Sequence, residues 1–326
     1  MKKLTLTAIL LFGTRLLLLG DTNPAAQQWV ITARQQANIF QPDASPFQLD
    51  ISFTVQEKVP IEGHLTLKWG SKERWWRNIV MSDFQQTDMR NGDKLYTDRN
   101  ARFTPIRITQ LVNIIHFAEA PEGVQVKKQK QEVEHGSEMT CLQVEGGRSR
   151  GMRSEVCLSP TSLEISSEEW KGLPDEQRRQ QYAEYFEFRA HRYPRKLELF
   201  VNGSKVVTAH VDSLTTSNLE PGLLVPPAGA IERRQCEGMK HAVPLKMPDP
   251  QYPESARQNR IMGDTTVSMT VLADGSVSNI ELIGSATHSM DSATLESLKR
   301  WKFKPAMCGT EPVISDIEVV VSFRLH

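Results

Sequence analysis

The chain has 326 residues, which is enough for about two domains with a core in each. It carries 39 lysines and arginines against 39 aspartates and glutamates, so its formal net charge is zero. This balance argues against a nucleic-acid-binding surface and against an acidic tail. After the first twenty positions no apolar run is long enough to cross a bilayer, which excludes a protein with several membrane spans.

The first 26 residues are expected to form a signal peptide or a short anchor. Lys2 and Lys3 precede a mostly apolar stretch over residues 4–19, a pattern typical of secretory signals. As a helix this stretch would span about 24 Å, less than the ~30 Å hydrocarbon core, and Arg15 interrupts it. We therefore expect an exported, periplasmic protein. Anchorage in the inner membrane, facing the periplasm, is the alternative.

Residues 27–222 are predicted to form one antiparallel sheet with a few helices. Apolar positions at helical spacing indicate a helix over residues 24–40, and strict alternation from Phe47 to Val55 then indicates half-buried strands. The dipeptides Asn91-Gly92 and Asn202-Gly203 predict tight hairpins.

A second helix is expected within the sheet domain, near residues 104–118. Thr104 would be its N-cap, and Pro105 would occupy the first helical position.

Four cysteines allow three pairings, and export permits disulfides. Cys141 and Cys157 are equally distant from a Gly-rich turn near position 149, so in a hairpin they would face each other. That pairing leaves Cys236 for Cys308. Four free thiols are the alternative, and a zinc site is disfavoured because no Cys-x-x-Cys motif or nearby histidine pair is present.

Residues 223–240 are expected to be a linker, because periodicity stops there and Pro and Gly concentrate. A smaller unit follows over residues 241–326. It has strands at 265–272 and 277–283, a helix at 289–302 and a last strand at 313–325, in the order β-β-α-β. The fold class is therefore α+β, with a half-barrel-like sheet domain before a small second domain.

The second unit resembles the C-terminal domain of TonB-type energy transducers over about 85 residues in one order. The matching features are Tyr252-Pro253 before a short helix, Ala256, Arg257, Ile261, Gly263, the Asp274-Gly275 turn, Asp291, the W-x-F-x-P-A run from Trp301 to Ala306, and the closing V-x-F-x-L. The transducers also have an uncleaved membrane helix and a long Pro-rich spacer. Here a folded domain stands in place of that spacer.

The resemblance implies a domain that binds an extended segment of an outer-membrane TonB-dependent receptor, or of another envelope protein, by adding it as a strand. An exposed sheet edge displays unpaired N–H and C=O groups that an incoming strand can satisfy. Such binding would contribute to energy-coupled transport. The positions that the resemblance assigns to the partner are Asp249, Pro250, Gln251, Tyr252, Ile317, Val319, Val320 and Val321.

The first domain resembles the half-barrel of the LolA and LolB lipoprotein carriers in its order of elements. A curved sheet of this kind can enclose an apolar ligand on its concave face. A carrier of lipid or lipoprotein acyl chains is therefore the alternative function. Four aromatic residues would line such a site, although the sequence favours their filling the core instead: Trp69, Trp75, Phe84 and Phe103.

No catalytic motif is present in the sequence. It contains no G-x-S-x-G, Walker, H-E-x-x-H or G-x-G-x-x-G pattern, and its eight histidines are scattered singly. We therefore expect a binding protein rather than an enzyme, with no cofactor, no metal and no nucleic-acid partner.

Overall fold

The computed structural model describes residues 24–42, 44–117, 123–134, 136–146, 153–171, 177–234, 236 and 238–325. Most of the predicted signal segment lies outside the described residues. Among the helices of the described ranges, none combines the length and the apolar character needed to cross a bilayer.

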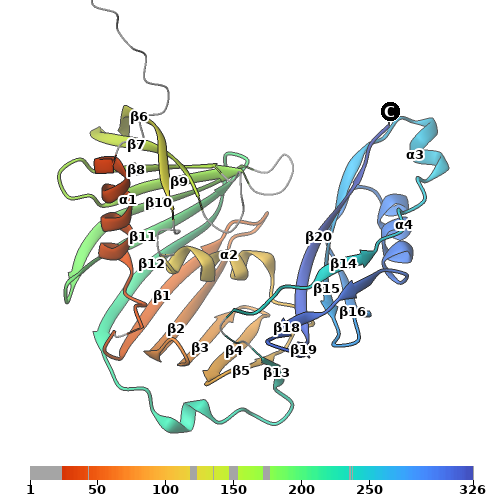
Figure 1. Cartoon of the computed structure of the whole chain (residues 1–326), viewed down its shortest axis with the longest axis horizontal. Coiled ribbons are helices and arrows are strands. Elements are labelled where there is room, and N and C mark those ends of the chain that lie inside the picture. The colour runs from red at the N-terminus through yellow and green to blue at the C-terminus, as the bar shows by residue number, and fades with distance from the viewer. Residues whose placement is uncertain are drawn as a thin grey trace, which may run out of the picture.

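The chain is α+β, as predicted, and most of it belongs to one antiparallel sheet that curves around two helices (Figure 1). The order of this sheet is β13-β5-β4-β3-β2-β1-β12-β11-β10-β9-β8-β7-β6. We call this sheet and its helices the first domain. Its strands are β1 (Phe47–Val55), β2 (Ile61–Ser71), β3 (Arg74–Met81), β4 (Gln85–Asn91), β5 (Lys94–Arg99), β6 (Gln125–Glu134), β7 (Ser137–Glu145), β8 (Arg153–Leu158), β9 (Ile165–Lys171), β10 (Gln177–Phe188), β11 (His191–Val201), β12 (Ser204–Thr216) and β13 (Ile231–Arg234).

Helices α1 (Pro24–Ala37) and α2 (Ile106–Ile115) cover the concave side of the sheet. The alternation in β1 explains why they pack there, because every second residue from Phe47 to Val55 is buried. Tyr193, also fully buried, donates its hydroxyl to the carbonyl of Ile115 at 2.7 Å. The helices and the inward side chains of the strands together form one apolar core.

The start of α2 differs from the prediction by one residue. Pro105 is the N-cap, with no side-chain capping bond, and Ile106 is the first helical residue. The hydroxyl of Thr104 instead donates to Gln86 Oε1 at 2.6 Å, so this side chain joins the helix to β4. A competing tertiary hydrogen bond therefore replaces the predicted cap.

Both predicted disulfides are confirmed. Cys141 lies directly opposite Cys157 in the β7–β8 pair and is bonded to it, and Cys236 is bonded to Cys308. On the loop-entropy model the two bonds stabilise the fold by about 3 and about 4 kcal/mol. The second bond joins the segment after β13 to the C-terminal region.

The segment that the sequence indicates as a linker contains regular structure. A short 3-10 helix, η1 (Pro221–Leu224), precedes β13, which pairs with β5 as an edge strand of the large sheet. This strand is not predictable from the sequence pattern, because four residues with two adjacent arginines carry no alternating apolar pattern.

Residues 238–325, which we call the second domain, contain a three-stranded sheet in the order β16-β15-β20. The predicted β-β-α-β order is present, and three very short strands lie between the helix and the last strand. Its elements are β14 (Val243–Lys246), α3 (Glu254–Gln258), β15 (Gly263–Val271), β16 (Val277–Gly284), α4 (His288–Leu298), β17 (Lys302–Lys304), β18 (Ala306–Cys308), β19 (Glu311–Val313) and β20 (Ser315–Phe323).

Candidate functional site

Strand β20 forms one edge of the three-stranded sheet. It pairs with β15 along its whole length, from Phe323 opposite Gly263 to Ser315 opposite Val271. Within the described ranges, no strand pairs with its other side. Nine residues of β20 therefore offer a row of backbone groups to an incoming strand.

The side chains of β20 divide between two different environments. Ile317, Val319 and Val321 face the domain core, where α4 covers the sheet. Asp316 and Glu318 alternate with them and are exposed on the opposite face. The backbone of β20 would thus hold a partner strand. The side chains of that partner would alternate between the core face and the exposed face of the sheet.

The buried carboxylate of Asp291 fixes α4 on the core face. It accepts hydrogen bonds from the Thr265 hydroxyl at 2.9 Å, from the Ser285 hydroxyl and from the backbone N–H of Ala286 at 3.2 Å. Thr287 caps the helix by accepting from the N–H of Met290. These bonds hold the helix N-terminus to β15 and to the turn that precedes the helix.

Trp301 holds the segment that leads into α3. Its indole Nε1 donates to the carbonyl of Pro248 at 3.1 Å, and the Ser297 hydroxyl donates to the same carbonyl. Immediately after that anchor come Asp249 and Gln251, both exposed, and the half-buried Pro250. The W-x-F-x-P-A motif therefore positions the predicted partner-binding stretch.

Tyr252 packs at the C-terminal end of β20. Its ring meets the ring of Phe323 edge-on at 5.5 Å between centroids, and its hydroxyl donates to the carbonyl of Ile261 at 2.6 Å. The structure thus brings Tyr252 next to the edge strand, at the end opposite Ile317. Direct contact of residues 249–252 with a partner stays a prediction.

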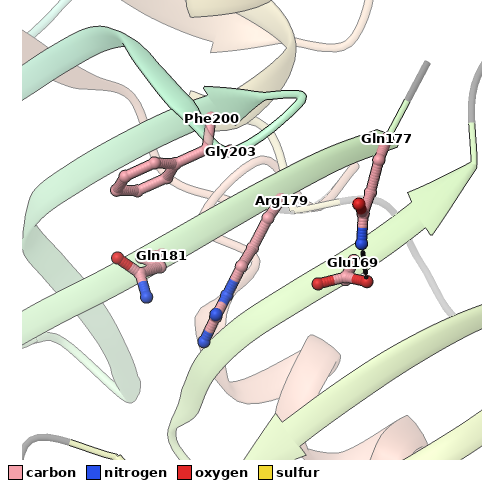
Figure 2. A pocket seen from close by; sticks show the side chains of 6 residues that line it. All are labelled: Glu169, Gln177, Arg179, Gln181, Phe200 and Gly203. Carbon is pink, nitrogen blue, oxygen red and sulfur yellow. Dashed lines mark hydrogen bonds between the residues drawn. The ribbon is translucent and has the colours of Figure 1, made fainter.

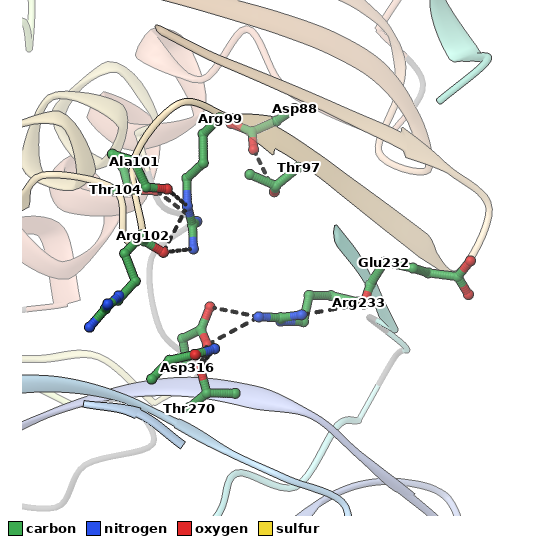
Figure 3. Close-up of polar contacts among 11 residues, drawn as sticks. Asp88, Thr97, Arg99, Ala101, Arg102, Thr104, Glu232, Arg233, Thr270 and Asp316 are labelled. Atoms are coloured by element: carbon green, nitrogen blue, oxygen red, sulfur yellow. Dashed lines mark hydrogen bonds and ion pairs between the residues drawn. The ribbon is translucent and has the colours of Figure 1, made fainter. Parts of the chain in front are cut away.

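Strand β13 joins the two domains through charged side chains that the sequence analysis did not single out. Arg234 pairs with Asp93 of the first domain and with Glu311 of the second. Arg233 donates to the carboxylate of Asp316 on β20 at 3.3 Å (Figure 3). Because Cys236 follows within two residues, the segment is tied to both domains by a strand ladder, ion pairs and a disulfide.

A pocket of about 200 Å³ lies where the first domain meets the polar face of the second sheet. Arg99 lies at this junction, where burial lowers the pKa of its guanidinium. Its side chain donates to the carbonyl oxygens of Ala101 and Arg102 at 3.1 Å each (Figure 3). The pocket therefore has a fixed cation on one wall and the β20 carboxylates on the other.

The four aromatic residues proposed to line a ligand site are all at least partly buried. Trp69 is 5% exposed, meets the ring of Phe40 edge-on and stacks on the ring of Phe47. Phe84 is 4% exposed, and Trp75 packs against the same core. Phe103 is 8% exposed and lines the pocket between the domains. Three of the four therefore belong to the apolar core of the first domain, and the lipid-carrier alternative stays a prediction.

A second hollow, of about 360 Å³, lies on the large sheet (Figure 2). Its lining is mostly polar: Glu169, Gln177, Arg179, Gln181, Phe200 and Gly203. Gln177 donates to Glu169, and Arg179 pairs with the buried Glu134, so these polar groups already have partners within the sheet.

One cluster of the first domain has the composition of a metal site. Ligand atoms of Glu132, Cys141, Glu155 and Cys157 lie within 4.8 Å of one another. The two sulfur atoms are joined in a disulfide, and Lys130 bridges the two carboxylates at 2.7 and 2.9 Å. The hydrogen bonds that Lys130 donates to Glu132 and Glu155 raise its pKa to about 12, so a protonated amine already lies between the two carboxylates.

Residues 248–325 match the family described as Gram-negative bacterial TonB protein C-terminal. "Protein TonB" of Vibrio cholerae is 32% identical over 78 residues, which are 24% of this chain and 32% of that protein. "Protein TonB" of Klebsiella aerogenes is 31% identical over 83 residues, which are 25% of this chain and 32% of that protein. The chain thus spans about a third of these relatives, and the predicted resemblance of its second domain is confirmed.

Two solved structures resemble this chain over about three fifths of its length. A LolA superfamily protein from Nitrosomonas europaea has a TM-score of 0.42 at 11% identity, covering 63% of this chain and 98% of that one. A putative outer membrane lipoprotein-sorting protein domain from Vibrio parahaemolyticus has a TM-score of 0.43 at 8% identity, covering 61% and 95%. Both scores are too low to bear on what the first domain binds.

Proposed function

We propose that this chain is a periplasmic binding protein of the TonB type that captures an extended segment of an outer-membrane receptor or another envelope protein. The segment is added as a fourth strand beside β20. The captured segment contributes backbone hydrogen bonds along the strand, and the second domain supplies the rigid template. Through this contact the chain takes part in energy-coupled transport across the envelope.

The open edge of β20 is the observation that carries this proposal. Its nine residues pair on one side only within the described ranges, and the strand lies in the region that matches the TonB family. The rest of the second domain holds this edge in place, with α4 fixed by Asp291 and the approach segment fixed by Trp301.

Proline substitutions on β20 test the proposal directly. The N–H groups of successive strand residues point to opposite sides, so one of Val319→Pro and Val320→Pro removes an outward donor and the other breaks the ladder with β15. The variant that breaks the ladder with β15 should have the lower melting temperature, so this measurement distinguishes the two variants. The probe is a set of synthetic peptides that tile the N-terminal segments of the outer-membrane receptors of the source cell.

The variant that keeps its melting temperature is expected to lose affinity for the bound peptide about tenfold or more, the cost of at least one hydrogen bond. Val243→Pro is the matched control, because Val243 is an exposed residue on the short strand β14 of the same domain. Unchanged affinity in the well-folded β20 variant would show that the edge is not the binding site.

A further inference from the structure

The pocket between the domains is built jointly by β20 and the first domain. From the second domain come Asp316, Ile317 and Glu318 of β20, with Ser268 of β15 and Ile283 of β16; from the first come Arg99, Phe103, Thr104, Ile106 and Thr109. Its volume of about 200 Å³ suits one large side chain rather than a folded segment.

This pocket lies on the sheet face that an added strand would share with Asp316 and Glu318. In an antiparallel pair, residues directly opposite each other project to the same face, with their Cβ atoms about 5 Å apart. Core residues and α4 cover the other face. A strand paired with the first half of β20 would therefore direct alternate side chains toward the first domain.

The pocket combines apolar side chains with charged groups from both domains: the carboxylates lie on β20, and the guanidinium of Arg99 lies on the opposite wall. Phe103, Ile106 and Ile283 provide the apolar surface, while Asp316 and Glu318 provide two carboxylates. Asp316 is held in place because it accepts from the Thr270 hydroxyl at 2.7 Å and from Arg233. A long side chain with a hydrocarbon stem and a cationic end matches this combination.

Arg99 is not itself the cation that occupies the pocket. Its guanidinium donates to two backbone carbonyls and to the Thr104 hydroxyl, so it forms part of the pocket wall (Figure 3). The ring of Phe103 lies 5.8 Å from the same guanidinium carbon. The cation of a guest would therefore meet the carboxylates of β20, on the opposite wall.

We propose that the first domain helps to select the partner: the pocket between the domains accepts a lysine or arginine of the strand that is added to β20. This inference rests on the proposed function, because the guest residue arrives as part of the captured segment. It gives the first domain a part in recognition that the TonB-like domain alone could not supply.

A random peptide library displayed on phage and selected on the full chain tests the inference. We expect the selected peptides to carry Lys or Arg at one fixed position, and their binding to require the β20 edge. Replacing that residue by norleucine, which keeps the stem and loses the charge, should weaken binding about fivefold, as should Glu318→Gln with the original peptide.

Helix α2 offers a matched pair of variants for the same peptides. Thr109 and Asn113 are both exposed and lie one turn apart, but only Thr109 lines the pocket. Thr109→Trp should obstruct the pocket and lower affinity for the lysine or arginine peptide at least about tenfold, whereas Asn113→Trp should leave it unchanged.

The outcomes separate this inference from the proposed function. Peptides that depend on β20 but show no basic position, or that bind Thr109→Trp as well as Asn113→Trp, overturn the pocket proposal and leave strand addition standing. A library that yields no peptide dependent on β20 overturns both.

Discussion

The two domains bury their sheets by different means. Within the described residues, the first domain wraps thirteen strands around α1 and α2, and its core is one large cluster of buried apolar side chains. The main sheet of the second has three strands and one covering helix, and single residues such as Asp291 and Trp301 each satisfy a particular backbone or helix-end requirement. A small domain therefore shows a recognisable sequence motif where a large sheet shows only alternation.

The largest effect on stability should come from removing a buried charge in the first domain. This charge is an exception to the apolar character of that domain's core. Asp88 is 3% exposed and accepts from Arg77 Nη2 at 2.6 Å, from Gln86 Nε2 at 2.8 Å and from the Thr97 hydroxyl at 2.7 Å. Asp88→Ala leaves the buried Arg77 without its counterion. We expect a loss of about 3–5 kcal/mol in the free energy of unfolding by urea.

The control for this variant is Asp98→Ala on the neighbouring strand, because Asp98 is exposed. That change should alter stability by less than about 0.5 kcal/mol. Hydrogen exchange should localise the damage of Asp88→Ala to β3, β4 and β5, with the second domain still protected. A loss of similar size in both variants would refute the counterion argument.

The next effect tests the claim that single residues hold the second domain together. Gly275 has a φ of +78°, and a Cβ there would lie 1.9 Å from the carbonyl oxygen of Phe303. The Gly275 carbonyl also accepts from the N–H of Phe303 at 2.8 Å. Gly275→Ala should cost about 3–4 kcal/mol, from the left-handed backbone and the displaced hydrogen bond.

Hydrogen exchange of Gly275→Ala should show lost protection in β15, β16 and β17 and unchanged protection in β1 and β12. Gly309→Ala is the control, since Gly309 also has positive φ, at 62°, but an added Cβ would meet nothing within 4 Å. Equal losses in the two variants would mean that only the backbone conformation matters, and that the contact with Phe303 does not.

The sequence predicts the parts of this fold that depend on local patterns. The alternation from Phe47 to Val55, the turn at Asn202-Gly203 and the facing cysteines each follow from neighbouring residues, and the structure confirms them. The buried network of Asp88 could not be predicted in this way. Its strand is rich in polar residues, and a polar residue is normally assigned to the surface unless its partners are known.

The candidate site also has one part that local sequence patterns predict and another part that they do not. The edge strand β20 follows from its alternation and from the TonB-like motifs around it, whereas the pocket beside it depends on where a separate domain lies. Arg233 reaches Asp316 across 83 positions of sequence. No local pattern in a single sequence encodes such a contact.

A smaller, pH-dependent effect should distinguish the first domain. The half-buried His116 stacks on Phe40 at 4.1 Å between ring centroids and donates from Nδ1 to the carbonyl of Val112 at 2.7 Å. Burial lowers its pKa from 6.5 to about 4, so below pH 6.5 the unfolded chain takes up a proton that the folded chain does not. Stability should therefore fall by about 3 kcal/mol in total between pH 6.5 and pH 4.

The measurement compares urea unfolding of the unmodified chain and of His116→Gln at pH 7 and at pH 4. The variant should lose less stability on acidification, because the carboxylates common to both proteins cancel in the comparison. His64→Gln is the control, since His64 is exposed. An equal pH dependence in the unmodified chain and in His116→Gln would show that His116 takes up a proton in the folded domain as readily as in the unfolded chain.

The smallest effect on stability should come from the ion pairs that join the two domains. Arg234 pairs with Asp93 and Glu311, and all three side chains are more than a third exposed, so solvent screens these pairs. Arg234→Ala should leave the melting temperature nearly unchanged, because the disulfide from Cys236 to Cys308 and the ladder with β5 persist. Hydrogen exchange in β13 should nevertheless increase, because the strand loses its ion pairs. Increased exchange in β20 as well would mean that Arg234 also holds the edge strand in place, and the junction would then couple partner binding to the contact between the domains.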